Sequence, residues 1–127
     1  MESDIRVLVV DEDEDVLELT ETFLERQADA LTALTEPSAT TALDRVETED
    51  IDCIVSDYRM PEMNGLELFD AVREQERDLP FFVLTAAADD ETLDAAKNSG
   101  VTGLVQKGVG TDHYTDLAER IVAAVDD

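Results

Sequence analysis

The sequence predicts an α/β fold in which helices cover both faces of a parallel sheet. Short, continuously apolar segments alternate five times with segments whose apolar residues recur at helical spacing. Continuous apolar runs are typical of strands that are buried on both faces. Strands that alternate with helices favour a parallel sheet in a three-layer α/β/α sandwich. Because 127 residues suffice for one core, we expect residues 1–127 to form a single domain.

The first half of the chain contains three predicted strands and two predicted helices. Arg6–Val10 (RVLVV) is the first strand, and a helix with one apolar face follows it to about Gln27. Ala30–Leu34 is a weaker strand, after which Pro37-Ser38 marks a helix start. Cys53–Ser56 (CIVS) is the next buried strand.

The second half of the chain continues the same alternation after a turn-rich segment, YRMPEMNG. Aspartate at a helix start accepts hydrogen bonds from free amides, and glycine at a helix end adopts the left-handed conformation. The predicted elements are a helix defined by Leu66, Phe69 and Val72, a strand at Phe81–Thr85 (FFVLT), a helix capped by Asp89 or Asp90 and closed by Gly100, a strand at Leu104–Gln106, and a helix from near Thr111-Asp112.

The charge balance limits the partners of this protein. It has 33 acidic and 9 basic residues, a formal net charge of −24, and the acids are spread along the chain. Such a field disfavours direct contact with nucleic acid and with anionic membranes. It also repels itself, so salt should favour the compact state. We expect adaptation to high salt; the alternative is an acidic domain without that adaptation.

Several features favour the cytoplasm. No segment approaches the roughly 18 consecutive apolar residues of a membrane span. The first residues, Met1–Asp4, are acidic and lead quickly into a strand, which is not the pattern of a signal peptide. The single cysteine, Cys53, lies in an apolar run and has no partner for an internal disulfide, so we expect it to be buried.

Chemically active side chains recur where the predicted strands end. In open α/β sheets, ligands bind beyond the carboxyl ends of the strands. Carboxylates from neighbouring strands repel each other unless a cation lies between them, and their oxygens suit Mg²⁺. A hydroxyl and an ammonium group complete a cradle for a phosphoryl group. The residues at these ends are Asp11-Glu12-Asp13, Asp57, Thr85 and Lys107.

Each of these residues also has an ordinary structural explanation. Asp57 alone could be a turn residue or a helix cap. Asp11 and Glu12 could belong to the acidic start of the next helix, where the helix dipole favours negative charge. Thr85 could be a simple hydroxyl at a strand end, and Lys107 could extend from an apolar strand into water.

Two other interpretations of the acidic segment after the first strand do not fit the sequence. A calcium loop would need glycine and glutamate where Val16 and Thr22 stand. A phosphatase of the haloacid dehalogenase type also begins from Asp-x-Asp after a buried strand. The chain has no room for the cap of that family, and the reading leaves Asp57 unexplained.

The sequence resembles the receiver domain of response regulators in two-component systems, from Arg6 to about Val125. The matching segments are VLVVDEDEDVLEL, CIVSDYRMPEMNGLEL, FFVLTA and GLVQKG. The second is the most specific, because Asp57 is followed by Met60-Pro61 and then Gly65. The acidic surface and the C-terminal segment are similar to receivers from halophilic archaea. The resemblance implies a flavodoxin-like sheet with strand order 2-1-3-4-5.

The resemblance also implies a function. Asp57 would accept a phosphoryl group from a phosphohistidine on a sensor histidine kinase or a phosphotransfer protein. The phosphorylated domain would then switch the binding of a downstream effector protein or domain. Such a domain is not an enzyme, because it performs only its own phosphorylation and dephosphorylation. A receiver fold that has lost the switch and only binds proteins remains the second hypothesis.

The individual roles follow from the same resemblance. The implied Mg²⁺ ligands are Asp11, Glu12, Asp57 and the backbone carbonyl of Arg59, with Asp13 as the substitute for Glu12. The side chain of Arg59 would shape access to the phosphoryl group or simply be solvated. Two further residues complete the site: Thr85, whose hydroxyl would donate to the phosphoryl group, and Lys107, which would pair with a phosphoryl oxygen.

Three residues depart from the family pattern. Glu12 replaces the usual second aspartate, which adds a methylene to a metal ligand. Leu104 stands where many receivers have an aromatic residue, so we expect a smaller or different change beside the last strand on phosphorylation. Gly108 replaces the proline that normally follows Lys107, so no cis peptide is expected there. His113 is expected to be a surface residue of the last helix.

Overall fold

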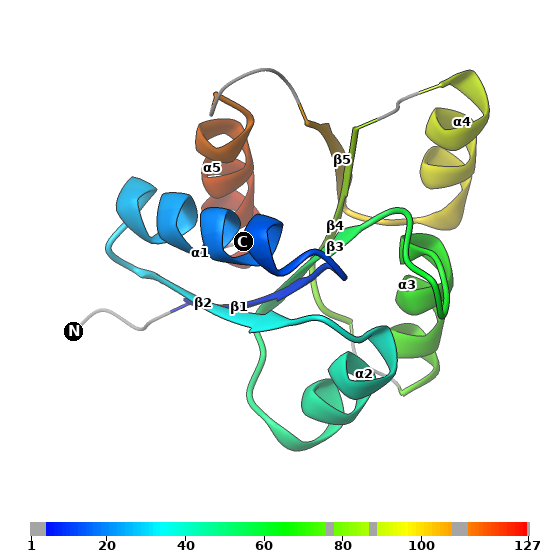
Figure 1. Ribbon diagram of the computed structural model, residues 1–127, viewed down its shortest axis with the longest axis horizontal. Helices are drawn as coiled ribbons and strands as arrows, with labels where there is room; N and C mark the ends of the chain where they lie inside the picture. Colours follow the sequence, from blue (N-terminus) through cyan, green and yellow to red (C-terminus); the bar gives the residue numbers. More distant parts are fainter. Residues whose placement is uncertain (1–4, 76–77, 87–88, 108–111, 127) are drawn as a thin grey trace.

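The computed structural model describes residues 5–75, 78–86, 89–107 and 112–126. Five parallel strands form one sheet in the order β2-β1-β3-β4-β5, so the predicted order and fold class are confirmed (Figure 1). The strands are β1 (Ile5–Val10), β2 (Leu31–Glu36), β3 (Cys53–Asp57), β4 (Phe81–Thr85) and β5 (Gly103–Gln106). The helices are α1 (Glu14–Gln27), α2 (Ala39–Thr48), α3 (Gly65–Glu74), α4 (Asp90–Ser99) and α5 (Asp112–Asp126).

The sheet separates two hydrophobic cores. Figure 1 shows α1 and α5 on one face, and α2, α3 and α4 on the other. Side chains alternate between the faces of a strand. Accordingly Val7 and Val9 of β1 pack in the core under α1 and α5, whereas Leu8 and Val10 pack under α2 and α3. Among the described residues, no helix is both long enough and apolar enough to cross a bilayer.

The predicted boundaries differ from the observed ones mainly at strand ends. The second strand runs from Leu31 to Glu36 instead of Ala30–Leu34, because Glu36 still pairs with the last residue of β1. The third strand includes Asp57, whose register partner in β4 is Leu84. The prediction for Cys53 is confirmed, because its side chain is fully buried.

Side-chain caps determine where several helices begin. Asp13 accepts hydrogen bonds from the first turn of α1, and Ser38 does so for α2. Asn64 and the third residue of α3 form a reciprocal capping box. Of the two candidate caps of α4, Asp89 is the one observed, and Gly100 ends that helix with φ +95° as predicted.

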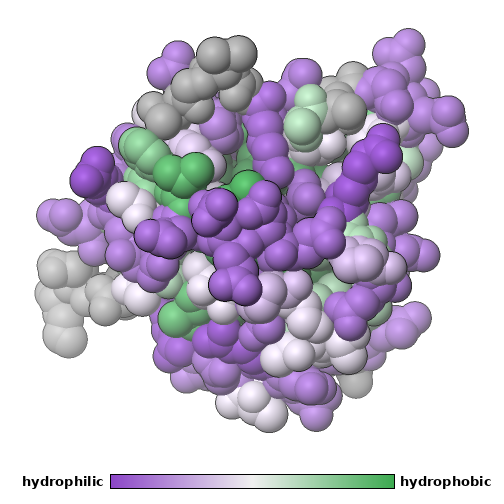
Figure 2. Space-filling model, in the orientation of Figure 1, coloured by the Kyte–Doolittle hydropathy of each residue, from purple (hydrophilic) through white to green (hydrophobic). Residues whose placement is uncertain are grey.

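Two of the basic residues, Arg6 and Arg45, form ion pairs with the acidic surface. Arg45 lies 3.0 Å from Glu49 and 3.7 Å from Glu36, and it donates to the backbone carbonyl of Thr35. Arg6 lies 3.4 Å from Glu49, which therefore faces two cations. The face seen in Figure 2 is mostly hydrophilic, with small separate hydrophobic patches. The cations thus relieve only part of the repulsion among the acidic residues.

Candidate functional site

The parallel register brings four strand ends to one edge of the sheet. β1 is aligned with β3, β3 with β4, and β4 with β5, with no offset that would separate their carboxyl ends. The backbone amide of Lys107 donates to the carbonyl of Thr85 at 2.7 Å, which holds the ends of β4 and β5 together. The side chains placed at or just beyond these ends are Asp11, Asp57, Thr85 and Lys107.

Lys107 lies between the two carboxylates of the site. Its Nζ is 3.4 Å from Oδ1 of Asp57 and 3.6 Å from Oδ2 of Asp11. The side chains of Asp57 and Asp11 are only 16% and 5% exposed, so the charges interact with little screening by water. The ammonium group therefore attracts both carboxylates at once. Because it carries one positive charge against two negative ones, Asp11, Asp57 and Lys107 together keep one excess negative charge.

Asp11 is the more deeply buried of the two carboxylates. Burial raises the pKa of its carboxyl above the ordinary value, and the negative charge of Asp57 raises it further. A hydrogen bond from the amide of Asp13 to Oδ1 of Asp11, at 2.9 Å, and the charge of Lys107 act in the opposite direction. The rise prevails, so the environment disfavours the ionised carboxylate and would favour an added cation.

The neighbouring acids are arranged differently. Asp13 uses its carboxylate to cap α1, accepting from the amides of Asp15 and Val16, so it is committed to the helix. Glu12 is exposed. In the described part of the chain, no group of three or more His, Cys, Asp or Glu side chains is gathered closely enough to bind a metal. The role of Glu12 as a ligand therefore stays a prediction.

The loop between β3 and α3 is held closely against Asp57. The amide of Tyr58 donates to Leu84 of β4, and the amide of Gly65 donates back to Tyr58 at 2.8 Å. A Cβ atom at Gly65 would lie 2.8 Å from the backbone oxygen of Asp57, closer than real contacts allow. The glycine of the MPEMNG segment is therefore needed because α3 begins in contact with the backbone of Asp57.

Arg59 extends from this loop toward α4. Its side chain is exposed, and hydrogen bonds from Thr92 together with the weaker influence of the Arg59 charge lower the pKa of Asp89. The guanidinium group thus lies close enough to the start of α4 to influence the charge of Asp89. An exposed side chain fits both alternatives left by the sequence, so the role of Arg59 stays a prediction.

The remaining predicted residues have mixed outcomes. Thr85 is buried, with 2% of its surface exposed. Leu104 is half-buried and lines a hollow between α4 and β5. Gly108 lies outside the described residues, as does the peptide bond that precedes it. The prediction for His113 was wrong in part: it is half-buried, its ring lies 4.0 Å from that of Tyr114, and its Nδ1 is buried.

The donor set fits Mg²⁺. This ion prefers oxygen ligands and usually takes one or two carboxylates while keeping several waters. Asp11 and Asp57 supply two carboxylates on adjacent strand ends, and the single ammonium group of Lys107 offsets only one of their two charges. A divalent cation would relieve that excess, and the backbone carbonyl of Arg59 as a further ligand stays a prediction.

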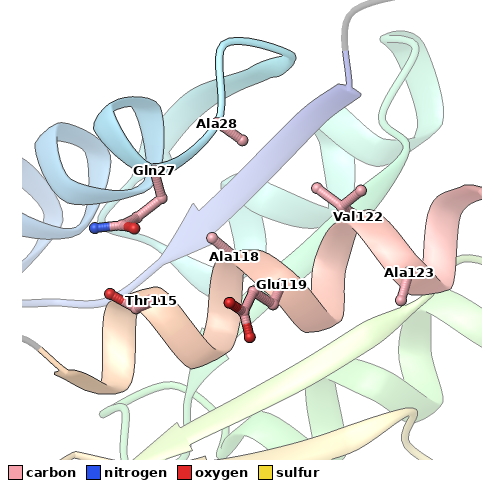
Figure 3. A pocket seen from close by; sticks show the side chains of 7 residues that line it. All are labelled: Gln27, Ala28, Thr115, Ala118, Glu119, Val122 and Ala123. Carbon is pink, nitrogen blue, oxygen red and sulfur yellow. The ribbon is translucent and has the colours of Figure 1, made fainter.

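A separate hollow lies between α1 and α5. It measures about 340 Å³ and is lined by small and polar side chains at the C-terminal end of α1 and along α5 (Figure 3). Its lining includes Gln27, Ala118 and Val122, and none of the strand-end residues described above. It is therefore not part of the candidate site.

Comparison with known proteins shows the family to which this chain is related. The response regulator receiver domain family matches residues 7–119 of this chain. The chain belongs to this family. An uncharacterised 14.6 kDa protein of Leptolyngbya boryana is 40% identical over 120 residues, covering 93% of this chain and 90% of that protein.

Two further relatives place this receiver domain in context. The response regulator SaeR of Staphylococcus aureus is 30% identical over 101 residues, which are 80% of this chain but only 43% of SaeR. The chain thus spans less than half the length of that regulator. The chemotaxis protein CheY4 of Vibrio cholerae has a similar structure, with a TM-score of 0.81, 26% identity, and coverage of 94% of this chain and 99% of that one.

Proposed function

We propose that this receiver domain accepts a phosphoryl group on Asp57 from a histidine kinase or a phosphotransfer protein. The observation that carries the proposal is the position of Lys107, whose Nζ lies within 3.6 Å of carboxylate oxygens of both Asp57 and Asp11. A phosphoryl group on Asp57 would bring further negative oxygens to this ammonium group. The half-buried setting strengthens that attraction.

The reaction needs positioning and charge neutralisation more than acid–base chemistry. A carboxylate oxygen of Asp57 attacks the phosphorus of the donor phosphohistidine. A P–O bond forms as the P–N bond breaks, and the electron pair of that bond returns to the imidazole. Lys107 then pairs with a phosphoryl oxygen, and the hydroxyl of Thr85 donates to another. The residues thus stabilise charge where it develops.

Mg²⁺ is the cofactor that we infer for this step. It would be held by Asp11, Asp57, the backbone carbonyl of Arg59 and Glu12, directly or through water. When bound, the ion supplies neutralising charge at the phosphoryl oxygens. The burial and raised pKa of Asp11 support this assignment, because they describe a carboxylate that an added cation would favour.

The same proposal covers partners and location. The phosphorylated domain binds a downstream effector protein or domain, and it turns over no external metabolite, so it is not an enzyme in that sense. We propose a cytoplasmic location. The net charge of −24 supports the absence of direct contact with nucleic acid or anionic membranes.

Phosphorylation with a small donor tests the function. The protein is incubated with acetyl phosphate and Mg²⁺, and its intact mass is measured, with EDTA in a parallel sample. We expect the mass of one phosphoryl group to be gained with Mg²⁺, little gain with EDTA, and no gain in Asp57→Asn. If the wild type gains no mass at any salt concentration, the second hypothesis of a purely protein-binding receiver fold is favoured instead.

We also propose that the protein is adapted to high salt, as in halophilic archaea. The support is the net charge of −24 on a largely hydrophilic surface. Salt screens this repulsion, since the Debye length falls from about 10 Å at 0.1 M to about 3 Å at 1 M. We expect the melting temperature to rise steadily over a KCl series extending above 1 M. A melting temperature that is indifferent to salt would contradict the proposal.

A further inference from the structure

Glu62 connects the loop that follows Asp57 to the start of α2. Its Oε1 accepts a hydrogen bond from the hydroxyl of Ser38 at 3.0 Å, and its Oε2 accepts one from the hydroxyl of Thr40 at 3.1 Å. The backbone amide of Thr40 also points at Oε1, at 3.5 Å. The loop carboxylate therefore binds the first turn of a helix that lies 22 residues earlier in the chain.

This position favours a carboxylate for physical reasons. The start of a helix presents free amides and a partial positive charge, which bind anions. The hydrogen bonds from Ser38 and Thr40 lower the pKa of Glu62, so its carboxyl group is ionised at neutral pH. In a protein with a net charge of −24, few other positions would draw a loop glutamate toward the body of the domain.

The start of α2 is itself tied to the strand that carries Asp11. The amide of Asp11 donates to the backbone carbonyl of Glu36 at 3.2 Å, and the side chain of Glu36 accepts from the amide of Ser38 at 3.4 Å. The buried residues Ala39 and Ala42 hold α2 against the sheet. A continuous set of hydrogen bonds therefore runs from Asp11, through β2 and α2, to Glu62.

Glu62 is three residues beyond Arg59, in the middle of the β3–α3 loop. The two ends of this loop are held by the hydrogen bonds of Tyr58 to Leu84 and of Gly65 to Tyr58. Between those ends, Met60 and Met63 pack against the core, and Glu62 adds side-chain hydrogen bonds to α2. Without it, the segment from Arg59 to Met63 would lose its side-chain hydrogen bonds to α2.

We propose that Glu62 is a positioning residue for the metal site. By binding the start of α2, its carboxylate holds the β3–α3 loop in the conformation that directs the Arg59 carbonyl toward Mg²⁺. The inference rests on the proposed function, because it concerns the same site. The competing explanation is that Glu62 only stabilises α2, in which case the melting temperature would change and the affinity for Mg²⁺ would not.

Four variants test this role: Glu62→Ala, Glu62→Gln, Thr40→Val and the double variant Glu62→Ala/Thr40→Val. Glu47→Ala is the matched control, since Glu47 is an exposed carboxylate of α2 for which the described residues provide no hydrogen bond or ion pair. The first measurement is backbone NMR relaxation of residues 59–63 in the metal-free protein. The second is the Kd for Mg²⁺ from amide shifts in a titration, at a temperature where all variants are folded.

Glu62→Ala should increase the motion of residues 59–63 before any metal is added, and should raise the Kd for Mg²⁺ about tenfold, the lower end for residues that orient ligands. Glu62→Gln and Thr40→Val should shift both quantities in the same direction by less. The double variant should bind Mg²⁺ no more weakly than Glu62→Ala, because Thr40→Val removes only a hydrogen bond that Glu62→Ala has already removed. Glu47→Ala should leave both quantities unchanged.

A Kd within twofold of the wild type in folded Glu62→Ala, with unchanged loop motion, would overturn the inference. If that variant does not fold, Glu62→Gln and Thr40→Val decide by the same criteria. A wild type that binds no Mg²⁺ would contradict the proposed function instead, and the metal-free loop measurement would then still decide whether Glu62 holds the loop.

Discussion

Replacing Asp11 with asparagine is expected to stabilise the metal-free protein and to abolish its stabilisation by Mg²⁺. Burial and the charge of Asp57 raise the pKa of Asp11, so the folded state disfavours the ionised carboxylate. Asparagine keeps the shape of the side chain without its charge. The gain without metal should be roughly 1 kcal/mol, typical of a single favourable replacement. With millimolar Mg²⁺ the order should reverse, because only the wild type gains binding energy.

The pH dependence has a definite sign. Since the pKa of Asp11 is higher in the folded state than in the unfolded state, the folded state binds more protons between the two values. The cost of ionising Asp11 is therefore absent below the unfolded pKa and is fully present above the folded one. The advantage of Asp11→Asn should grow as the pH rises through the folded pKa of Asp11.

Thermal unfolding at several pH values, with and without Mg²⁺, measures these effects. Asp44→Asn is the matched control, because it removes one negative charge from an exposed position of α2. The control should show neither the stabilisation nor the loss of the Mg²⁺ response. An Asp11→Asn variant that is less stable than the wild type in EDTA, or that still responds fully to Mg²⁺, would contradict this account of the site.

Replacing Gly65 with alanine should disturb Asp57 without touching any side chain of the site. The added Cβ would lie 2.8 Å from the backbone oxygen of Asp57 and 3.3 Å from the Cα of Tyr58. Both neighbours are backbone atoms, so the start of α3 and the end of β3 must move apart. We expect a loss of about 1–3 kcal/mol of stability, as for other forced insertions into packed regions. Phosphorylation by acetyl phosphate should also slow markedly in the folded variant.

Gly100→Ala separates the two effects of Gly65→Ala. Gly100 has φ +95°, so alanine there should cost roughly 1–2 kcal/mol through backbone strain at the end of α4. Gly100 precedes β5 and thus lies near the amino-terminal ends of the strands, whereas Asp57 lies at their carboxyl-terminal ends. Both variants should lower the melting temperature, but only Gly65→Ala should change the phosphorylation rate measured well below it. Equal rates in the two variants would show that Gly65 is needed for stability alone.

The strand ends could be predicted from the sequence because each is a local pattern. An apolar run that stops at Asp57 or at Thr85 marks both a strand and its carboxyl end, and parallel alignment then gathers the ends. The strand order came from family resemblance, since alternation alone allows several orders. The extension of β2 to Glu36 was missed because polar residues on an edge strand weaken the apolar pattern.

Other features of the site depend on contacts between distant segments. Nothing local to Glu62 indicates that it binds the start of α2, although a serine and a threonine at a helix start were a visible signal. The steric reason for Gly65 appears only when α3 is packed against Asp57. The partial burial of His113 follows from its contact with Tyr114, whose ring also stacks on Phe23 of α1.

The most direct test of the central claim is to locate the phosphoryl group within the phosphorylated protein. Borohydride reduces an aspartyl phosphate to homoserine, which peptide mass spectrometry identifies at a single residue. After phosphorylation with acetyl phosphate and Mg²⁺, we predict homoserine at position 57 and unmodified aspartate at position 11. Homoserine at another position, or none despite a gain in intact mass, would contradict the assignment of Asp57 as the phosphoacceptor.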